Sequence, residues 1–298
     1  MTTTVTEPAG ETAELSRGLI GAAIAVCAWS AGAVLAKGIE MDGLAIGAYR
    51  FAFFATVVIF WMRLNGTPFR LRMIRESLWG GLALGGDIAL FFSAVKLTSV
   101  VNATIIGSLQ PIVVGVVAAR FFGERVRASD ALWSLVAFAG VIAVLTTSNN
   151  SDANDLRGDL LAVAAMLSWS AYFIFSKDSK KRMTPTEFTA GTALWAALIC
   201  SPLGIAFGQD MSWPSWKNWG LLIAMALGSG LIGHALMNWS LVRIPLWIGS
   251  TFTLLIPVFS ALLAWIFLDE SLSILQAVAM AVVIGALVMI VRGQRQPA

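Results

Sequence analysis

The chain contains few charged residues: Asp, Glu, Lys and Arg together make up 12% of its 298 residues. Soluble domains carry about 25%, so this composition excludes an ordinary soluble fold. Hydrophobic residues account for 58% of the sequence. Together these values predict a polytopic membrane protein that is surrounded by the lipid bilayer.

Residues that bind metals or form cross-links are also scarce. There is one histidine, and there are two cysteines, Cys27 and Cys200, which both lie inside apolar segments. Neither cysteine has metal-site spacing, and two thiols do not make a disulfide framework, so small apolar packing is their expected role. No basic run is interleaved with aromatic residues. We therefore predict no metal, no cofactor and no nucleic-acid partner.

Ten apolar segments account for most of the chain, each near the length of about 20 residues that a helix needs to cross a bilayer. No cleavable signal peptide is evident, and the first segment has the features of an uncleaved anchor. The loops are too short to hold a separate folded domain. The segments are placed at residues 18–37, 43–62, 77–96, 99–121, 130–147, 157–176, 186–207, 217–240, 246–267 and 273–291.

The basic residues predict the orientation of these segments. With the N-terminus in the cytoplasm, 15 of the 20 Lys and Arg fall on the cytoplasmic side and four on the other side, while Arg50 stays within the membrane. Short cytoplasmic loops normally carry such an excess. Both termini are therefore predicted to be cytoplasmic, in a multi-pass protein of the cell (inner) membrane.

One stretch of the third segment recurs later in the chain. It runs from Gly80 to Lys96 and holds Asp87 near its middle, where a carboxylate costs roughly 3 kcal/mol to insert into a bilayer. Adding 147 to its number takes Asp87 to His234, the single histidine. Two unusual residues therefore occupy the same place in two copies of one segment, which indicates a functional position.

The internal repeat covers most of the sequence. Trp29-Ser30-Ala31 matches Trp169-Ser170-Ala171 at an offset of 140 residues, and Pro111 matches Pro257 at an offset of 146. Each half holds five predicted helices, and because five is odd, the two copies enter the membrane from opposite sides. Inverted repeats with a site at their interface are a transporter architecture. The predicted fold is therefore all-α, with ten transmembrane helices in two inverted five-helix repeats around a central cavity.

The repeats also set the predicted domain boundaries. Residues 1–16 are a disordered cytoplasmic tail, 17–147 the first repeat, 148–156 a periplasmic linker, 157–292 the second repeat and 293–298 a cytoplasmic tail. Because one chain holds both repeats, we expect a monomer.

Several short motifs recur in a fixed order. They are Trp29-Ser30 with its echo in the sixth segment, Arg50-Phe51 in the second, and two Pro-then-Glu units, Pro111 to Glu124 and Pro257 to Glu270, followed by Gly140 and Gly285. In order, spacing and duplication these motifs resemble the drug/metabolite transporter superfamily, specifically its ten-helix EamA-type exporters. The resemblance spans about residues 15–292. Among the branches, it is nearest to the amino-acid exporters, including those for aromatic amino acids.

This resemblance implies a transporter that exports small metabolites through a central cavity by alternating access, rather than an enzyme. The second repeat departs from the pattern at two positions. Thr192 stands where Arg50 would fall, and Asp269 stands where the first repeat has Gly123. The first departure leaves the halves electrostatically unequal, which would let the substrate lean toward one repeat.

Asp87 is the first candidate substrate-binding residue. An acid inside the membrane usually faces the protein interior or a watery cavity and marks a substrate or proton path. At 1.5 Å per residue, Arg50 lies about 10 Å and Asp87 about 15 Å from the outer face, so the arginine can reach the carboxylate. A structural ion pair between them is the alternative, and one residue can serve both roles.

His234 lies about 22 Å from the outer face by the same count, just inside the midplane. Asn238 follows it one turn later on the same helix face, as Phe91 follows Asp87. All three are candidates for substrate binding, although a lone histidine on an apolar helix is often a packing residue.

Trp29 and Trp169 lie in the middle of their segments, away from the interfacial belt where tryptophan normally gathers. Their duplication suggests that they flank the pathway, where a flat ring can stack on a substrate; core packing is the alternative. Tyr49, beside Arg50, and Asn102 in the fourth segment complete the predicted substrate-binding set.

Pro111 and Pro257 each interrupt a predicted helix after about one third of its length, because proline removes a backbone hydrogen bond and bends the helix. They are predicted hinges for opening on opposite faces. Glu124 and Glu270 come soon after them, at the turns into the fifth and tenth helices. We expect each glutamate to accept backbone amides at the N-terminus of the helix that follows it.

Small residues four apart occur at Gly81 and Gly85 and at Ser229 and Gly233, and such pairs allow close helix contact.

Ser229 and His234 also raise the question of an intramembrane serine enzyme. Five residues of an α-helix turn about 140° beyond a full circle, so these two side chains are expected to point apart, which argues against an enzyme.

The favoured function is a secondary transporter that exports amino acids or similar small zwitterions. Asp87 or Arg50 would engage the ammonium or the carboxylate, and the central tryptophans would hold the side chain. Nucleotide sugars or phosphorylated metabolites are the alternative cargo, but such cargo favours several Lys or Arg and the membrane interior offers Arg50 alone. Proton antiport and facilitated diffusion both fit, because Asp87 or His234 could titrate but neither has to.

Overall fold

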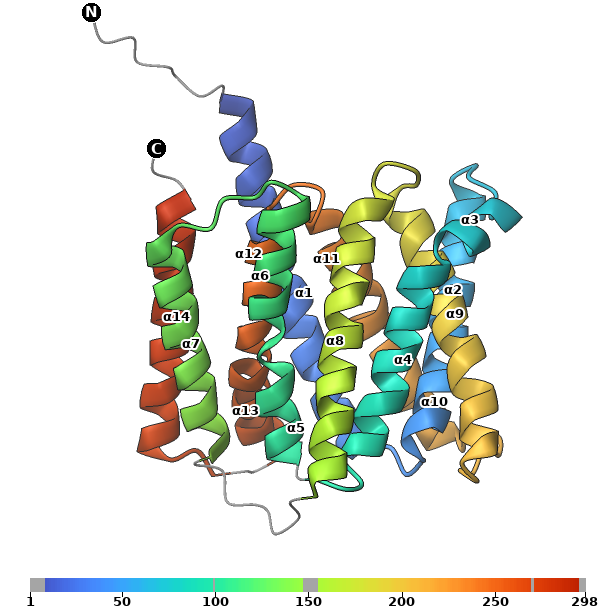
Figure 1. Ribbon diagram of the computed structural model, residues 1–298. Helices are drawn as coiled ribbons and strands as arrows, with labels where there is room; N and C mark the ends of the chain where they lie inside the picture. The colour runs from blue at the N-terminus through green and yellow to red at the C-terminus, as the bar shows by residue number, and fades with distance from the viewer. Residues whose placement is uncertain (1–8, 99, 147–154, 269–270, 295–298) are drawn as a thin grey trace, which may run out of the picture.

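The computed structural model describes residues 9–98, 100–146, 155–268 and 271–294. In these residues the regular structure is helical, without a strand, and the helices stand side by side in one bundle (Figure 1). The first helix starts and the last helix finishes at the same end of the bundle (Figure 1). We call this the terminal end, and the opposite one the far end.

Each of the ten predicted segments corresponds to a helix or to a helix built in pieces. Within the described residues, nine spans are long and apolar enough to cross a membrane, and α4, of 17 residues, is slightly shorter. The sequence analysis missed the short helix α3 (Leu71–Glu76). The spans are α1 (Ala9–Lys37), α2 (Gly43–Leu64), α4 (Leu78–Ala94), α5 with α6 (Val100–Gly107, Gln110–Phe121), α7 (Ala128–Thr146), α8 (Leu156–Ser179), α9 (Pro185–Ala206), α10 with η1 and α11 (Trp216–Met225, Ala226–Ala235, Leu236–Ser240), α12 with η2 and α13 (Leu246–Thr251, Phe252–Leu254, Leu255–Phe267) and α14 (Ile274–Gln294).

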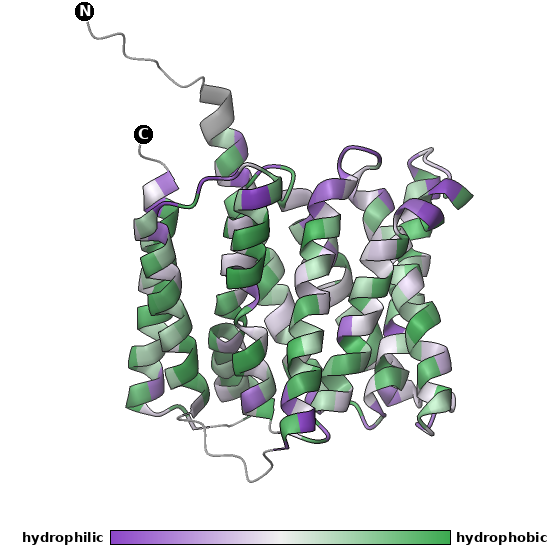
Figure 2. Cartoon of the chain, viewed as in Figure 1, coloured by the Kyte–Doolittle hydropathy of each residue, from purple (hydrophilic) through white to green (hydrophobic). Residues whose placement is uncertain are grey.

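The two halves run in opposite senses, as predicted. Helix α1 enters the bundle from the terminal end, whereas α8, which opens the second half, enters from the far end (Figure 1). Hydrophobic residues predominate along the length of the helices and hydrophilic residues gather toward the ends (Figure 2), as expected for helices that span a bilayer.

The halves interdigitate instead of forming two separate bodies. Helix α4 packs on α8 and α9, α2 packs on α9, and α7 packs on α14. Helix α1 inserts between η1 and α13 of the second half. The main helix–helix interfaces of the described residues therefore join one half to the other.

The predicted disordered tail is too long. Helix α1 begins at Ala9, so residues 9–16 are helical and only residues 1–8 of the predicted tail lie outside the described residues. An ion pair of 2.8 Å joins Glu14 to Arg17 one turn later, and a second of 2.8 Å joins Glu14 to Arg243. The second pair ties the start of α1 to the other half, which the sequence pattern does not reveal.

The other boundary predictions fall mostly outside the described residues. Of the predicted linker 148–156, Asp155 caps α8 by accepting the Arg157 amide, and α8 begins at Leu156. Of the predicted tail 293–298, the first two residues still belong to α14. Arg127 of the first half donates to the Gly293 carbonyl there. The last turn of α14, like the first turns of α1, is therefore bonded to the other half.

Both predicted proline interruptions occur. Helix α5 ends at Gly107 and α6 begins at Gln110, with Pro111 in its first turn. In the second half, the 3-10 turn η2 separates α12 from α13, which carries Pro257 in its first turn. Thr253 donates to Gln110 Oε1 over 2.9 Å, with both side chains buried, so the two breaks are bonded to one another. Their use as hinges stays a prediction.

Glycines allow α4 and α9 to approach closely, as the Gly81 and Gly85 pair predicts. A Cβ on Gly85 would lie 2.7 Å from Ile199 Cδ1 and 2.9 Å from Ile199 Cβ, and a Cβ on Gly81 would overlap Trp195. Ser229 and Gly233 likewise face Gly32 and Trp29 of α1. These contacts leave no room for a side chain at the crossings.

We expect Gly85→Ala to lower the free energy of unfolding by about 1–3 kcal/mol, because a new methyl group at this crossing must displace Ile199. Gly115→Ala is the matched control, since a Cβ at Gly115 would meet nothing within 4 Å. The control should gain slightly from better helix propensity. Thermal unfolding in detergent compares the two variants, and an equal Tm for both would contradict the close crossing.

Candidate functional site

His234 lies at the centre of an aromatic cluster near the middle of the bundle. The centroid of its ring is 5.3 Å from that of Trp29, 6.1 Å from Trp169 and 5.7 Å from Tyr172. Phe51 and Phe54 follow at 5.8 and 6.3 Å. These rings come from α1, α2 and α8, so three of the predicted site residues, Trp29, Trp169 and His234, are brought together from both halves.

A polar network continues from the histidine toward the terminal end. Asn238 Nδ2 donates to the Tyr172 hydroxyl and to Thr189 Oγ1, each over 2.9 Å, and Asn238 Oδ1 accepts from Ser176 over 2.6 Å. The Tyr172 oxygen lies 3.3 Å from His234 Nδ1. Because Tyr172 accepts from Asn238, its own hydrogen is free for Nδ1. All members of this network are buried, and Asn238 thus joins the predicted site.

Arg50 and Asp87 lie beside the cluster. Their charges interact, and Arg50 also acts electrostatically on Cys200 and His234. Among the described residues, however, no hydrogen bond or ion pair within 4.0 Å joins Arg50 to Asp87. Instead, the Arg50 guanidinium carbon lies 4.5 Å from the centroid of the Phe51 ring. The direct structural pair that was one alternative for Asp87 is therefore not formed in this conformation.

Two buried donors at this place lack partners. Arg50 Nε and Trp29 Nε1 are inaccessible and make no hydrogen bond within the described part of the chain. Asp87, Arg50 and Trp169 nevertheless keep part of their side-chain surface accessible. Partly accessible polar groups in the middle of a bundle are what the predicted central cavity requires.

The helix that carries His234 is of an unexpected type. Residues Ala226–Ala235 form the π-helix η1, and π-helical turns occur often at functional sites. Within it, Gly233 makes room for the Trp29 indole, since a Cβ there would lie 2.5 Å from Trp29 Nε1. The wider helix and the glycine together bring the histidine and the tryptophan into contact.

This helix type also changes the argument about Ser229. In a π-helix, residues five apart lie nearly on the same face, so α-helical geometry does not separate Ser229 from His234. The hydrogen bonds separate them instead: Ser229 donates to the Met225 carbonyl over 2.9 Å, while His234 turns to Tyr172. The described residues form no serine–histidine pair.

Three predicted site residues lie away from the cluster. The Tyr49 hydroxyl donates to the Met211 carbonyl, and its ring packs against Trp213 and Trp219. Phe91 packs against Ala94, Ala103 and Ala162 in a small separate apolar cluster. Asn102 Nδ2 donates to Thr98 Oγ1 over 3.4 Å in α5. The structure does not bring these three side chains to His234.

Sequence reasoning missed Tyr172, Phe51 and Phe54 as members of the cluster. Tyr172 stands three residues after Trp169, and Phe51 and Phe54 stand one and four residues after Arg50. Helical spacing places Tyr172 near Trp169 and Phe54 near Arg50, so proximity on the same helix was the available signal for these two. Phe51 is only adjacent to Arg50 in sequence, which gives no such signal. The π-helix carried no comparable signal.

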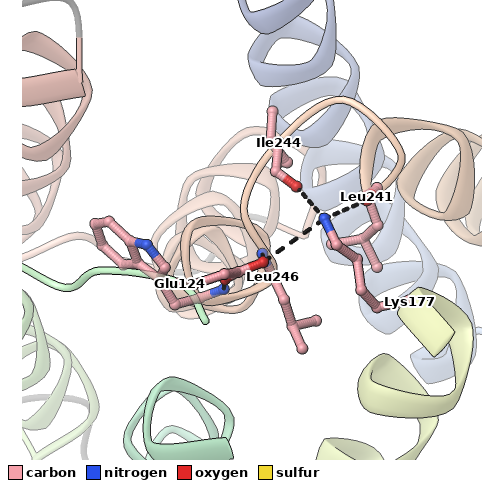
Figure 3. Close-up of polar contacts among 6 residues, drawn as sticks. Glu124, Lys177, Leu241, Ile244 and Leu246 are labelled. Carbon is pink, nitrogen blue, oxygen red and sulfur yellow. Dashed lines mark hydrogen bonds and ion pairs between the residues drawn. The ribbon is translucent and has the colours of Figure 1, made fainter. Parts of the chain in front are cut away.

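A second polar cluster lies at the terminal end and is shown in Figure 3. Glu124 accepts the amides of Leu246 and Trp247 over 2.8 and 3.2 Å, and lies 3.7 Å from the Lys177 ammonium. Lys177 donates to the carbonyls of Leu241 and Ile244 over 2.9 and 2.8 Å. We call Glu124, Lys177 and these backbone groups the Glu124 cluster.

Glu124 therefore accepts helix-terminal amides, as expected, but the predicted helix was wrong. It caps α12 of the other half, not the next helix in sequence, because the loop after α6 crosses to the start of α12. Its repeat mate Glu270 lies outside the described residues.

Lys180 makes a further polar contact at this end, with a residue of the predicted site. Its ammonium donates to the Asn238 carbonyl over 2.7 Å and lies 5.8 Å from the Phe188 ring centroid. Burial lowers the pKa of Lys180 to about 7, and the positive charge of Lys177 adds to this shift. Asn238 thus connects the histidine network to an ammonium that titrates near neutral pH.

The site shows no arrangement suited to a metal. In the described residues, no three His, Cys, Asp or Glu side chains are grouped as metal ligands would be. The polar groups that are present instead match small organic ions: a guanidinium, a carboxylate and an imidazole, surrounded by aromatic rings.

Known proteins resemble this chain in sequence and in fold. The model of the EamA-like transporter family matches residues 16–146 and 156–292. The threonine/homoserine exporter RhtA of Salmonella typhimurium (strain SL1344) is 27% identical over 269 residues, which is 88% of this chain and 87% of that protein. The aromatic amino acid exporter YddG of Ancylobacter novellus is 29% identical over 154 residues, 51% of this chain and 52% of that protein. One crystal structure, at 22% identity, shares the fold with a TM-score of 0.81 over 95% of this chain and 99% of that chain.

We expect the free energy of unfolding to rise from about pH 7 toward pH 10. The unfolded chain keeps lysine protonated up to a pKa of about 10.4, whereas folded Lys180 loses its proton near 7. One proton corresponds to about 1.4 kcal/mol per pH unit, and Lys180→Met should remove that slope. Unfolding in detergent at several pH values measures it.

Lys181→Met is the matched control, because Lys181 is exposed and pairs with Asp178 at the surface. Its pH slope should equal that of the unaltered protein. A slope that Lys180→Met leaves unchanged would contradict the buried, weakly basic state of Lys180.

Proposed function

This chain belongs to the EamA-like transporter family, whose model matches both of its halves, and on this premise we propose that it exports amino acids across the cytoplasmic membrane by alternating access. It is a multi-pass membrane transporter. The finer part of the proposal concerns the substrate: a small zwitterion with an apolar or hydroxyl-bearing side chain. Similarity to the threonine/homoserine exporter and the aromatic amino acid exporter supports this class.

The unpartnered donors beside His234 carry the proposal. A substrate carboxylate supplies the acceptor that Arg50 Nε and Trp29 Nε1 lack, and a charged acceptor strengthens both bonds. The Asp87 carboxylate then faces the substrate ammonium. The rings around His234 provide an apolar surface for the side chain, and Trp29 and Trp169, from the two halves, lie on that surface.

Several cations would favour the alternative cargo of nucleotide sugars or phosphorylated metabolites. Within the described residues, Arg50 is the guanidinium beside the His234 cluster, and it is balanced by Asp87. A zwitterion matches this neutral sum of charges, whereas a phosphate does not.

We place the terminal end in the cytoplasm, because the excess of Lys and Arg lies there. The Glu124 cluster and the buried Asn238 network close this end, while Asp87 and Arg50 stay partly accessible below it. This conformation supports a state closed to the cytoplasm. Opening requires α8 to separate from the start of α12, and the proline breaks are the proposed hinges. One chain supplies both halves, so a monomer suffices.

We expect proteoliposomes to catalyse counterflow of labelled amino acids from a panel that includes threonine, homoserine, phenylalanine and tryptophan. Asp87→Asn and Arg50→Gln should each reduce the rate about 10- to 100-fold, because each removes a charged hydrogen-bond partner worth about 1.5–3 kcal/mol. A labelled nucleotide sugar in the same panel tests the alternative cargo. A pH gradient tests proton coupling.

Asp178→Asn serves as the matched control, because Asp178 is an acid of the same helix as Trp169 that pairs at the surface with Lys181 and Arg182. It should transport at the normal rate. The proposal fails if the unaltered protein exchanges no amino acid, or if the control loses as much activity as Asp87→Asn.

We also expect the Glu124 cluster to limit access from the cytoplasm. Glu124→Ala leaves two amides without their acceptor and removes the carboxylate beside the Lys177 ammonium, which costs about 1.4–2 kcal/mol. The open state should then be populated about tenfold more. The reporter is Ser168→Cys, in a chain without native cysteines, because Ser168 Oγ lies against α4 at Gly86, next to Asp87. A membrane-impermeant maleimide added from the cytoplasmic side measures the labelling rate.

Glu76→Ala is the control for this experiment, because Glu76 lies at the same end and pairs with exposed Arg72. It should label as slowly as the parent protein. Equal labelling of parent and Glu124→Ala would show that the cluster does not control access.

A further inference from the structure

An open cavity of about 470 Å³ lies at the terminal end, away from the site described above. Arg72, Arg75, Glu76, Trp79 and Arg182 line it. The first four residues belong to α3 and the start of α4, and Arg182 belongs to the turn between α8 and α9. The cavity is thus shared by the two halves of the chain, and transport as proposed makes no use of it.

The lining has an excess of positive charge. Three guanidinium groups stand against the one carboxylate of Glu76, which is paired with Arg72 over 2.7 Å. Arg182 pairs with Asp178 over 2.8 Å and its carbonyl accepts from Arg72. Arg75 forms no ion pair or hydrogen bond with another side chain among the described residues. An anion would therefore find at least one uncommitted guanidinium, with two more at the cavity wall.

The residues next to the cavity place it at the boundary of the hydrocarbon. Trp79 is 62% exposed, and Leu71, the first residue of α3, is 81% exposed. Exposed tryptophan at the end of a spanning helix marks the headgroup level. Figure 2 shows hydrophilic residues around α3 above the largely hydrophobic surface of the helices.

We propose that this cavity binds the phosphate headgroup of an anionic phospholipid from the cytoplasmic leaflet. Arginine matches a phosphate through paired N–H donors, and basic pockets at this level are suited to anionic lipid headgroups. Trp79 gives the glycerol and the first carbons of the acyl chains an apolar wall. A soluble phosphate compound would leave this wall without an occupant.

The bound lipid joins the halves at the cytoplasmic end. Its phosphate contacts Arg75 of the first half and Arg182 of the second, on the turn that follows Lys177 and Lys180. Trp195 Nε1 donates to the Ile74 carbonyl over 2.8 Å, so α3 is already fastened to α9. An anionic lipid adds a second connection between α3 and the second half of the chain.

The test uses purified protein in nanodiscs of dioleoylphosphatidylcholine with increasing fractions of dioleoylphosphatidylglycerol. Tm should rise with the phosphatidylglycerol fraction, and the rise should weaken at high ionic strength. Arg75→Gln and Arg182→Gln should each weaken the apparent lipid affinity about fivefold, as expected for one basic residue at a membrane surface. Arg75→Lys, which keeps the charge without the paired donors, should fall between.

Arg125→Gln is the matched control, because Arg125 is an exposed arginine of the same end outside the cavity. It should keep the affinity of the unaltered protein. Each variant is first compared in pure phosphatidylcholine, where an unchanged Tm shows that it folds. Glycerol 3-phosphate, added in water, is the probe for a soluble anion.

Three results would overturn the proposal. Equal losses in Arg125→Gln and Arg75→Gln would mean that diffuse surface charge attracts the lipid. Stabilisation by phosphatidylcholine to the same degree would remove the need for an anion. Tight binding of glycerol 3-phosphate that competes with the lipid would assign the cavity to a soluble phosphate compound. None of these results bears on amino-acid transport, so they are separate from a failure of the proposed function.

Discussion

Asn238 makes the one set of hydrogen bonds on which the centre of this protein depends. Inside a bilayer an unpaired polar group costs several kcal/mol, yet Asn238 is fully satisfied. Its side-chain nitrogen donates to Tyr172 and Thr189, and its side-chain oxygen accepts from Ser176. Its backbone carbonyl accepts from Lys180. These bonds fix α8 and α9 against α11, which sets the ring of His234 against Trp29. The ring of His234 is therefore positioned by a buried polar network rather than by apolar packing alone.

Much of the fold could be predicted from the sequence. Hydropathy places the ten spans, and the odd number of spans in each repeat fixes the inversion, because both follow from local composition and counting. The positions of Asp87 and His234 in two copies of one segment led to the neighbourhood of the candidate site. Polar side chains are costly to bury in a bilayer, so an aspartate and a histidine inside apolar segments were easy to recognise.

The remainder depends on contacts between residues far apart in the chain. Glu124 was expected to cap the next helix, but the loop delivers it to α12, which no local pattern encodes. The π-helix η1 has ordinary apolar composition, so its register is decided by packing against α1. Tyr49 neighbours Arg50 in sequence but points to Met211, because adjacent residues on a helix face different directions.

The interdigitation of the halves has a consequence for how the chain can fold. Helices α4, α2 and α7 find their main partners in α8, α9 and α14. Glu124 caps α12, which is synthesised near the end of the chain. One repeat on its own would leave these faces and its carboxylate without partners. A half-length ancestor could therefore have been a stable protein only as a pair of antiparallel copies, and fusion made that pairing permanent.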